Sequence, residues 1–201
     1  LDFFFAYGSI LFLGSYNLLC RVGEAASRIQ GLLSFARPSA LNSSEVNLEQ
    51  LINQTLLLVH NTLKKQQVEV EFEYFHENTA LQADAEQLKQ VFLNIILNAV
   101  EAMSQNPPER SRTLIISIEK GASIDDHSHY LLLSFEDSGK GIGEKDLDHI
   151  FNPFFTTKDE GTGLGLAICY GIINRHEGEI EVHSTPGKGT CFTIKLPQYI
   201  V

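Results

Sequence analysis

The chain has 201 residues, of which 43% are hydrophobic, so it can bury the core of one domain and carry at most a short appendage. Its net charge of −10 argues against a general affinity for nucleic acid. The three cysteines, Cys20, Cys169 and Cys191, are far apart and have neither metal-ligand spacing nor a disulfide framework, which favours a reducing cytoplasm.

Residues 1–20 form an apolar segment of uncertain origin, whose composition differs from that of the residues after it. Residues 3–20 carry no charge, but a membrane span needs about 20 apolar residues, and glycine, serine and asparagine interrupt this run. No basic stretch precedes it, so a signal peptide is not expected. A segment that packs on the next helix, or a fusion remnant, is favoured over a membrane span.

Residues 21–37 carry apolar residues at helical spacing, which predicts an amphipathic helix that Pro38 ends. Residues 38–45, PSALNSSE, are expected to form a linker. From Val46 the chain predicts a helix and then a half-buried strand over residues 68–75, where apolar residues alternate with glutamates.

A further helix is expected over residues 90–103, QVFLNIILNAVEAM, with Asp84 as its N-cap. Asn94 and Asn98 lie four residues apart, so their side chains face the same way. Amides within an otherwise buried helix need polar partners. A hydrated magnesium ion beside one of them would provide a partner, because magnesium takes oxygen ligands and accompanies phosphates.

Two strands are predicted over residues 113–120 and 130–137, joined by a polar hairpin link. Asp137 ends the second strand and opens the glycine cluster DSGKGIG. Glycines let the backbone approach a ligand closely and adopt positive φ angles. A carboxylate beside such a turn can accept a hydrogen bond from an amine, such as the exocyclic amine of adenine.

A second glycine cluster, GTGLG at residues 161–165, directly precedes the helical run LAICYGII. Consecutive backbone N–H groups at the start of a helix form an anion site, so this cluster predicts a phosphate cradle. The polar stretch before it, residues 152–163, is expected to act as a lid that orders on binding. Either cluster alone could be a glycine-rich surface turn, so the prediction depends on their pairing and order.

The last two strands are predicted over residues 178–184 and 190–197, joined by the turn TPGKG. Five strands and about three helices predict an α+β fold. We expect a two-layer sandwich, with a mixed sheet on one side and helices on the other, preceded by an N-terminal helical segment.

Five motifs between residues 86 and 197 resemble those of sensor histidine kinases, in the family's order. The helix with Asn94 and Asn98 resembles the N box, DSGKGIG the first glycine box, IFNPFFTTK the F box, GTGLGLAI the second glycine box and STPGKGTCFTIKLP the third. The superfamily also includes gyrase, the heat-shock chaperone and mismatch-repair ATPases. The run Asn-Ala-x-Glu-Ala-Met is similar to the nitrogen-regulatory subgroup.

The resemblance implies that residues 46–201 are an ATP-binding catalytic domain, with ATP and Mg2+ as cofactors. Asp137 would bind adenine, and Thr190 would support that carboxylate through water. Asn98 would ligate magnesium. The catalytic residues would be Asn94 and Lys158, and Lys158 would steady the terminal phosphate. The other residues implied in nucleotide binding are Gly139, Gly141, Gly143, Thr156, Thr157, Gly161, Thr162, Gly163, Leu164 and Gly165. Phe154 and Phe155 are expected to serve packing.

The reaction implied is transfer of the terminal phosphoryl group to a histidine on a dimerisation domain, and then to a response regulator receiver domain. Residues 21–37 resemble the second helix of that dimerisation hairpin, which implies a homodimer through N-terminal helices. The protein would lie in the cytoplasm, either free or as the cytoplasmic part of a membrane-associated sensor. In the hydrolysing relatives a glutamate occupies the position of Asn94, which favours a kinase here.

The family's acceptor pattern, a histidine followed by an acidic residue, two further positions and Asn-Pro, does not occur in this sequence. Self-phosphorylation of this chain alone is therefore in question. His60 is expected at the surface, His127 and His129 in a solvated turn, and His149 or His176 near the nucleotide. Two alternatives stay open: a non-phosphorylating nucleotide-binding module, and a serine kinase of the anti-sigma type.

Overall fold

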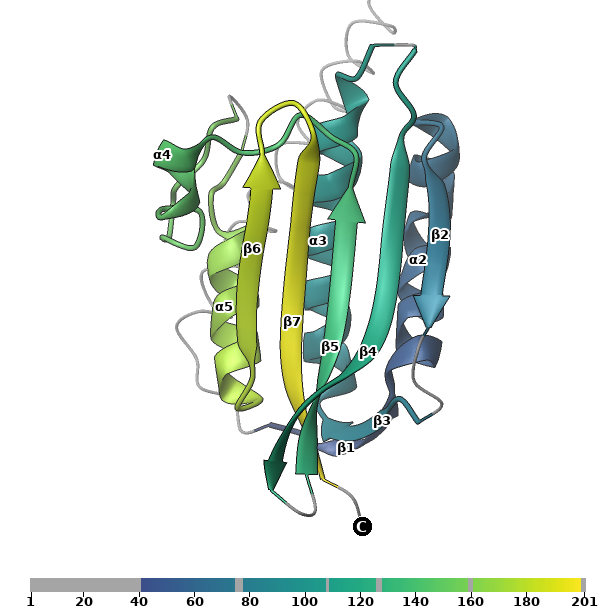
Figure 1. The fold of residues 1–201 in the computed structure, drawn as a ribbon, viewed down its shortest axis with the longest axis vertical. Coiled ribbons are helices and arrows are strands. Elements are labelled where there is room, and N and C mark those ends of the chain that lie inside the picture. Colours follow the sequence, from purple (N-terminus) through teal and green to yellow (C-terminus); the bar gives the residue numbers. More distant parts are fainter. Residues whose placement is uncertain (1–40, 75–77, 108, 126–127, 159–160, 200–201) are drawn as a thin grey trace, which may run out of the picture. The chain divides into compact units, whose positions relative to one another are not determined.

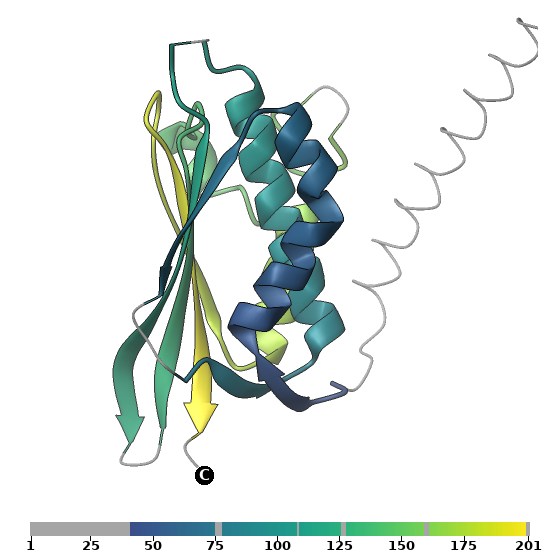
Figure 2. The ribbon, with the colours of Figure 1, turned by 90° about the vertical axis from the view of Figure 1, so that its right-hand side faces the viewer.

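A five-stranded mixed sheet forms one layer of the structure, and helices cover one of its faces (Figures 1 and 2). The computed structural model describes residues 41–74, 78–107, 109–125, 128–158 and 161–199, within a unit that runs from Ala40 to Val201. The segments predicted at residues 1–20 and 21–37 lie outside the described residues.

The sheet has the strand order β2-β4-β5-β7-β6. Its strands are β2 (Glu69–Tyr74), β4 (Thr113–Asp125), β5 (Ser128–Asp137), β6 (Glu179–Thr185) and β7 (Gly189–Tyr199). β2 pairs with β4 in parallel and the remaining neighbours are antiparallel, so the sheet is mixed, as predicted.

The helices are α2 (Leu48–Lys65), α3 (Ala85–Ser104), the single turn α4 (Glu144–Leu147) and α5 (Gly165–Arg175). Asp84 caps α3 by accepting from the Gln87 backbone N–H at 3.1 Å, which confirms the predicted N-cap. α2 begins two residues later than predicted, because β1 (Ser44–Asn47) pairs with β3 (Ala80–Ala83) in a small antiparallel sheet. The sequence did not predict this pair, which includes two residues of the expected linker.

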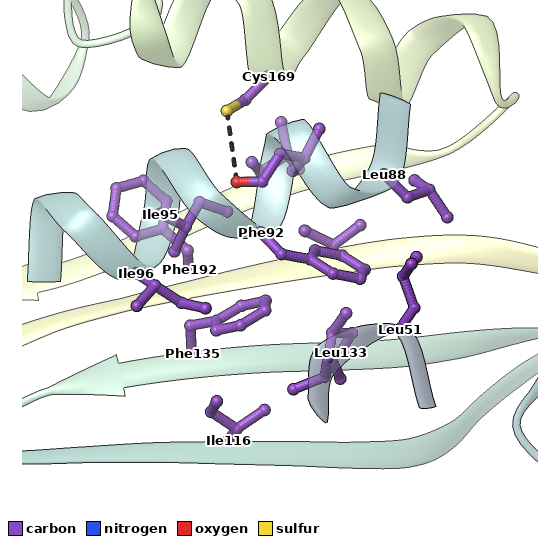
Figure 3. Packing of buried hydrophobic residues seen from close by; sticks show 14 of the residues in the cluster. Leu51, Leu88, Phe92, Ile95, Ile96, Ile116, Leu133, Phe135, Cys169 and Phe192 are labelled. Carbon is purple, nitrogen blue, oxygen red and sulfur yellow. Dashed lines mark hydrogen bonds between the residues drawn. The ribbon is translucent and has the colours of Figure 1, made fainter. Parts of the chain in front are cut away.

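The core lies between α3 and the sheet (Figure 3). Phe92 of α3 and Phe135 of β5 are almost fully buried, and their ring centroids are 5.7 Å apart. Cys169 of α5 is also buried, with its thiol 3.9 Å from the Val91 carbonyl oxygen. Burial raises the pKa of this thiol to about 12, so Cys169 is a neutral packing residue. The two-layer α+β prediction is confirmed.

Two histidines differ from the predictions. His129 is only 4% exposed within β5, because the strands extend further than the hydrophobic alternation indicated, and the predicted solvated turn is wrong for this residue. His176 is 8% exposed and forms the C-cap of α5, at the opposite end of that helix from the second glycine cluster. His127 lies outside the described residues, whereas His60 is exposed as predicted.

His176 connects two helices. Its Nδ1 lies 2.9 Å from the Ile172 carbonyl oxygen, and its Nε2 accepts from the Asp84 backbone N–H at 3.0 Å. The ring is therefore neutral, with its proton on Nδ1, and it attaches the end of α5 to the start of α3.

Each helix in the described part of the chain is too short or too polar to cross a membrane.

Candidate nucleotide-binding site

Successive turns of α3 contact three of the predicted motifs. The Asn94 Nδ2 atom donates to the Gly165 carbonyl oxygen at 3.3 Å, at the start of α5. One turn later the Asn98 Oδ1 atom accepts from Lys158 Nζ at 2.9 Å. A further turn on, the Ala102 carbonyl oxygen accepts from the Lys140 backbone N–H at 3.2 Å. α3 thus brings together the second glycine cluster, the F-box lysine and the first glycine cluster.

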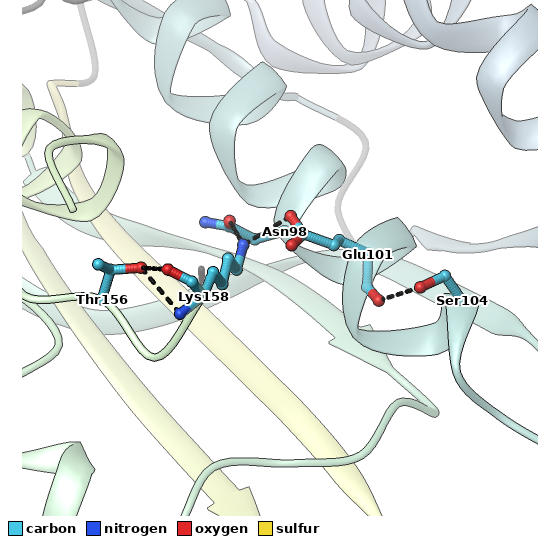
Figure 4. A network of polar contacts seen from close by, with 5 residues as sticks. All are labelled: Asn98, Glu101, Ser104, Thr156 and Lys158. Carbon is cyan, nitrogen blue, oxygen red and sulfur yellow. Dashed lines mark hydrogen bonds and ion pairs between the residues drawn. The ribbon is translucent and has the colours of Figure 1, made fainter. Parts of the chain in front are cut away.

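Asn94 and Asn98 are only half-buried and both have protein partners in this structure, so their positions do not by themselves require a metal ion. The environment of Asn98 nevertheless fits a cation (Figure 4). Lys158 Nζ lies 2.9 Å from Asn98 Oδ1 and 2.7 Å from Glu101 Oε2, so two oxygens of α3 already share a positive charge. Amide and carboxylate oxygens are ligands of the kind that magnesium takes. In the described ranges no group of three His, Cys, Asp or Glu side chains is placed to hold a metal.

The ion pair between Lys158 and Glu101 is partly exposed, with side-chain exposures of 36% and 57%. Ion pairs in such positions contribute little to stability. Lys158 can therefore exchange its present partners for the phosphates of a nucleotide at small energetic cost.

Asp137 lies at the end of β5 and is only 5% exposed. Its Oδ1 atom accepts from the Gly139 backbone N–H at 2.7 Å. Burial raises the pKa of this carboxyl to about 6, although the N–H groups of Gly139 and Thr190 and the charge of Arg110 act to lower it. At neutral pH the group is an ionised acceptor in a water-poor position, as recognition of an amine requires.

Thr190 faces Asp137 across the β5–β7 ladder and is 4% exposed. Its hydroxyl lies 3.0 Å from the Ser184 hydroxyl, which in turn accepts from the Ile142 backbone N–H at 2.8 Å. The Thr190 backbone N–H lowers the pKa of the Asp137 carboxyl through a hydrogen bond. The first glycine cluster is thus attached to β6 and β7, and the expected water-mediated role of Thr190 stays a prediction.

Two glycines of the clusters occupy positions that other residues resist. Gly141 has a φ of +72°, and an added Cβ atom would collide with the Thr185 carbonyl oxygen. Gly163 has a φ of +64°, and an added Cβ atom would lie 2.6 Å from the Phe154 carbonyl oxygen. Both turns therefore depend on glycine.

The start of α5 is suited to phosphate. Leu164 precedes the helix and offers no side-chain acceptor, so the first N–H groups of α5 remain available to an anion. The other predicted contact residues lie in the loops that lead to α4 and α5: Gly143, Thr156, Thr157, Gly161 and Thr162. Thr156 Oγ1 accepts from the Lys158 backbone N–H at 3.1 Å, which shapes the turn before the lysine.

The two F-box phenylalanines differ. Phe155 packs against the core and has its ring centroid 5.9 Å from that of His149, in agreement with a packing role. Phe154 is 64% exposed and has a φ of +69°, an unusual conformation for a bulky residue. His149 is exposed and lies just after α4, with its Nδ1 atom 3.3 Å from the Asn152 Nδ2 atom.

Sequence reasoning missed Arg110 and Ser184, which hold the first glycine cluster from outside it. Arg110 lies outside the five predicted motifs, whereas Ser184 is the first residue of the predicted third glycine box but was given no role there. The three carbonyl partners of Arg110 are 29 to 78 residues away, and the Ile142 N–H that donates to Ser184 is 42 residues away. No local pattern could therefore have indicated these contacts.

The family described as histidine kinase-, DNA gyrase B-, and HSP90-like ATPase matches residues 83–200 of this chain. The sensor histidine kinase ZraS of Escherichia coli (strain K12) is 40% identical over 172 residues, covering 84% of this chain and 34% of ZraS. The signal transduction histidine-protein kinase AtoS of the same organism is 43% identical over 169 residues, covering 84% of this chain and 26% of AtoS. The chain thus spans about a third or less of these curated relatives.

Two solved structures of the histidine kinase ThkA are also similar. Its catalytic domain is 33% identical with a TM-score of 0.67, and the match covers 78% of this chain and 96% of that domain. ThkA in complex with the response regulator TrrA is 28% identical with a TM-score of 0.71, covering 90% and 49% respectively. The chain therefore belongs to the histidine kinase-, DNA gyrase B- and HSP90-like ATPase family. Within it, the matched part is an ATP-binding catalytic domain of the histidine kinase type.

Proposed function

We propose that this chain is the catalytic part of a sensor histidine kinase in a two-component system. It would bind Mg-ATP and transfer the terminal phosphoryl group to a histidine on a dimerisation domain. The observation that carries the proposal is the convergence on α3, where Asn94 contacts the start of α5 and Asn98 contacts Lys158 within one further turn.

Each part of the nucleotide has a candidate partner. The Asp137 carboxylate would accept from the exocyclic amine of adenine, and the N–H groups at the start of α5 would bind phosphate oxygens. Asn98 Oδ1 would hold magnesium, which when bound neutralises phosphate charge. Lys158 would leave Asn98 and Glu101 and place its charge on the terminal phosphate. The protein's contribution is then positioning and charge stabilisation.

The position of Asn94 supports a kinase over a hydrolase. Its amide donates to the Gly165 carbonyl oxygen and lies 3.7 Å from the Cys169 sulfur, so it helps to place α5 against α3. An amide has no basic lone pair with which to activate water. Asn94 would therefore act by orienting the phosphate-binding end of α5.

The partners follow from the same proposal. The acceptor would be a histidine-bearing dimerisation helix, and residues 21–37 would be the second helix of such a hairpin, followed by a linker over 38–45 and the catalytic domain over 46–201. A response regulator would receive the phosphoryl group next. This is supported by the similar kinase ThkA, whose structure is known in complex with the response regulator TrrA. The run from Asn98 to Met103 favours membership of the nitrogen-regulatory subgroup. A cytoplasmic location is favoured because the proposed reaction uses ATP and because Cys169 and Cys191 are free thiols.

A second candidate is a regulatory module that binds nucleotide without phosphorylating, which the missing acceptor pattern favours. The two can be separated with ATP labelled on its terminal phosphate, in the presence of magnesium. The chain is incubated alone and with an added dimerisation hairpin that carries an acceptor histidine, and both reactions are repeated with Asn98→Ala.

Acid-labile label on the hairpin that disappears with Asn98→Ala would support the kinase. Label on the chain alone would mean that it contains an acceptor outside the family pattern. Bound ATP with no label on either protein would favour the regulatory module.

A further inference from the structure

We infer that Arg110 is a positioning residue of the adenine site. Its guanidinium joins the first glycine cluster to the β6–β7 turn, through a carbonyl two residues after the carboxylate that would bind the base. This inference rests on the proposed nucleotide site, and nothing in the predicted motifs includes the segment between α3 and β4.

The geometry of Arg110 is that of a three-way bridge. Its guanidinium Nη2 atom donates to the Gly139 carbonyl oxygen at 2.9 Å and to the Lys188 carbonyl oxygen at 2.7 Å. The Nη1 atom donates to the Gly187 carbonyl oxygen at 2.7 Å. A planar fork with five N–H donors can serve three carbonyls at fixed positions, whereas an ammonium on a flexible stem cannot reproduce that arrangement.

Arg110 is itself held in place. Its backbone N–H donates to the Pro107 carbonyl oxygen at 3.0 Å, and the neighbouring Asn106 is buried. The Asn106 amide donates to the Ser138 carbonyl oxygen at 3.0 Å. The segment after α3 therefore contacts the carbonyls of two consecutive residues that follow Asp137, and Figure 1 shows this connection and the β6–β7 turn at the same end of the sheet.

The two loops that Arg110 joins also contact each other. The Gly187 backbone N–H donates to the Lys140 carbonyl oxygen at 2.7 Å. This contact fixes the spacing of the loops, while Arg110 adds charge to the same place. A structural bridge alone would need only hydrogen-bond donors, so a permanent cation whose charge acts on Asp137 points to a role in the site.

The titratable groups around Asp137 lie on the α3–β4 segment, on β5 and on β7. Arg110 on the α3–β4 segment lowers the pKa of the carboxyl, and Glu136 on the same strand raises it. On β7, burial and the charges of Glu136 and Asp137 raise the pKa of the Cys191 thiol, which stays neutral. The side chains of Lys140 and Lys188 are exposed. Arg110 is thus the cation that favours the ionised, accepting form of Asp137.

The test is ADP binding without magnesium, measured by calorimetry from pH 5 to pH 8 on the 201-residue chain. For the unchanged chain, affinity should fall as the pH drops through about 6. Arg110→Gln should weaken binding about five-fold at pH 7 and move the acid midpoint up by about half a pH unit. Arg110→Lys should keep the midpoint, because the charge remains, but still lose affinity with the fork.

Arg112→Gln is the matched control. Arg112 lies two residues away and also donates to three carbonyl oxygens, those of Gln66, Ser104 and Asn106, none of which belongs to the glycine clusters. It should destabilise the fold without moving the midpoint. The titration of ADP itself is common to all samples, so only differences between variants count.

Two results would overturn the inference: an Arg110→Gln chain with unchanged affinity and midpoint, or an equal shift in Arg112→Gln. If the unchanged chain failed to bind ADP at any pH, the proposed function would fail instead. Arg110→Lys keeps the test decisive if the glutamine variant does not fold.

Discussion

Replacing Asp137 with asparagine is expected to stabilise the folded chain at pH 7 while it weakens adenine nucleotide binding. The reason is that the carboxylate is buried and charged. Its pKa is raised from 3.8 to about 6, and each pH unit corresponds to about 1.36 kcal/mol, so the ionised group destabilises the folded chain by about 3 kcal/mol above pH 6.

The sign follows from proton binding. Because the pKa is higher in the folded chain than in the unfolded one, the stabilising contribution of the protonated group is complete below pH 3.8 and is lost as the pH rises through about 6. Asparagine carries no charge at any of these pH values. Its oxygen can still accept from the Gly139 N–H, but its amide would face the Thr190 N–H, which costs about 1 kcal/mol.

The net expectation for Asp137→Asn is a gain of about 1 to 2 kcal/mol in the free energy of unfolding at pH 7, which disappears near pH 4. Urea unfolding at the two pH values measures it. ADP affinity should fall about 10-fold or more, because the variant loses a charged acceptor for the base. A variant that is less stable at pH 7, or that shows the same difference at both pH values, would refute the reasoning.

Three further predictions concern residues around the same site. Asp84→Ala should lower the free energy of unfolding by about 1 kcal/mol at pH 7 and by less at pH 3, as measured by urea unfolding. The reason is that burial raises the pKa of the Asp84 carboxyl but hydrogen bonds from Gln87 and Asn42 lower it by more, so the carboxylate stabilises the folded chain mainly at higher pH. An equal loss at both pH values would contradict this. Lys158→Met should slow phosphoryl transfer to an acceptor hairpin about 100-fold in a labelled-ATP assay, with ADP affinity changed by less than about three-fold. Equal losses of both would place Lys158 in binding instead. His176→Ala should destabilise the chain by about 2 kcal/mol through an unpaired Asp84 N–H, without altering ADP affinity; a loss of affinity would return His176 to the nucleotide site.

Local patterns predicted much of this fold. The alternation of apolar residues along β4, β5 and β7 places residues such as Leu114, Ile116 and Ile118 in the core, and all three are fully buried. The spacing of Asn94 and Asn98 predicted their shared face, since four residues is close to one helical turn. These features depend only on neighbours in the sequence, so they can be read from it.

The β1–β3 pair and the burial of His129 could not be predicted in this way. β1 and β3 are four residues long and separated by α2 and β2, so neither has enough alternation to indicate a strand. His129 lies at a position where β5 pairs with β7, opposite Gln198, and its burial depends on a partner strand that is 69 residues away. Hydrophobic periodicity gives no information about a polar residue that long-range packing buries.

The candidate site combines both kinds of information. α3 contributes its polar contacts at positions 94, 98 and 102, while Leu88, Phe92 and Ile96 on another side of the helix are fully buried against the sheet and α2. One helical period therefore fixes the order in which the glycine clusters and Lys158 meet α3. The proposed adenine end is held by Arg110 and Ser184, whose partners come from other elements. The residues proposed to contact the nucleotide therefore lie in local motifs, whereas the contacts that hold those motifs together are determined by the tertiary fold.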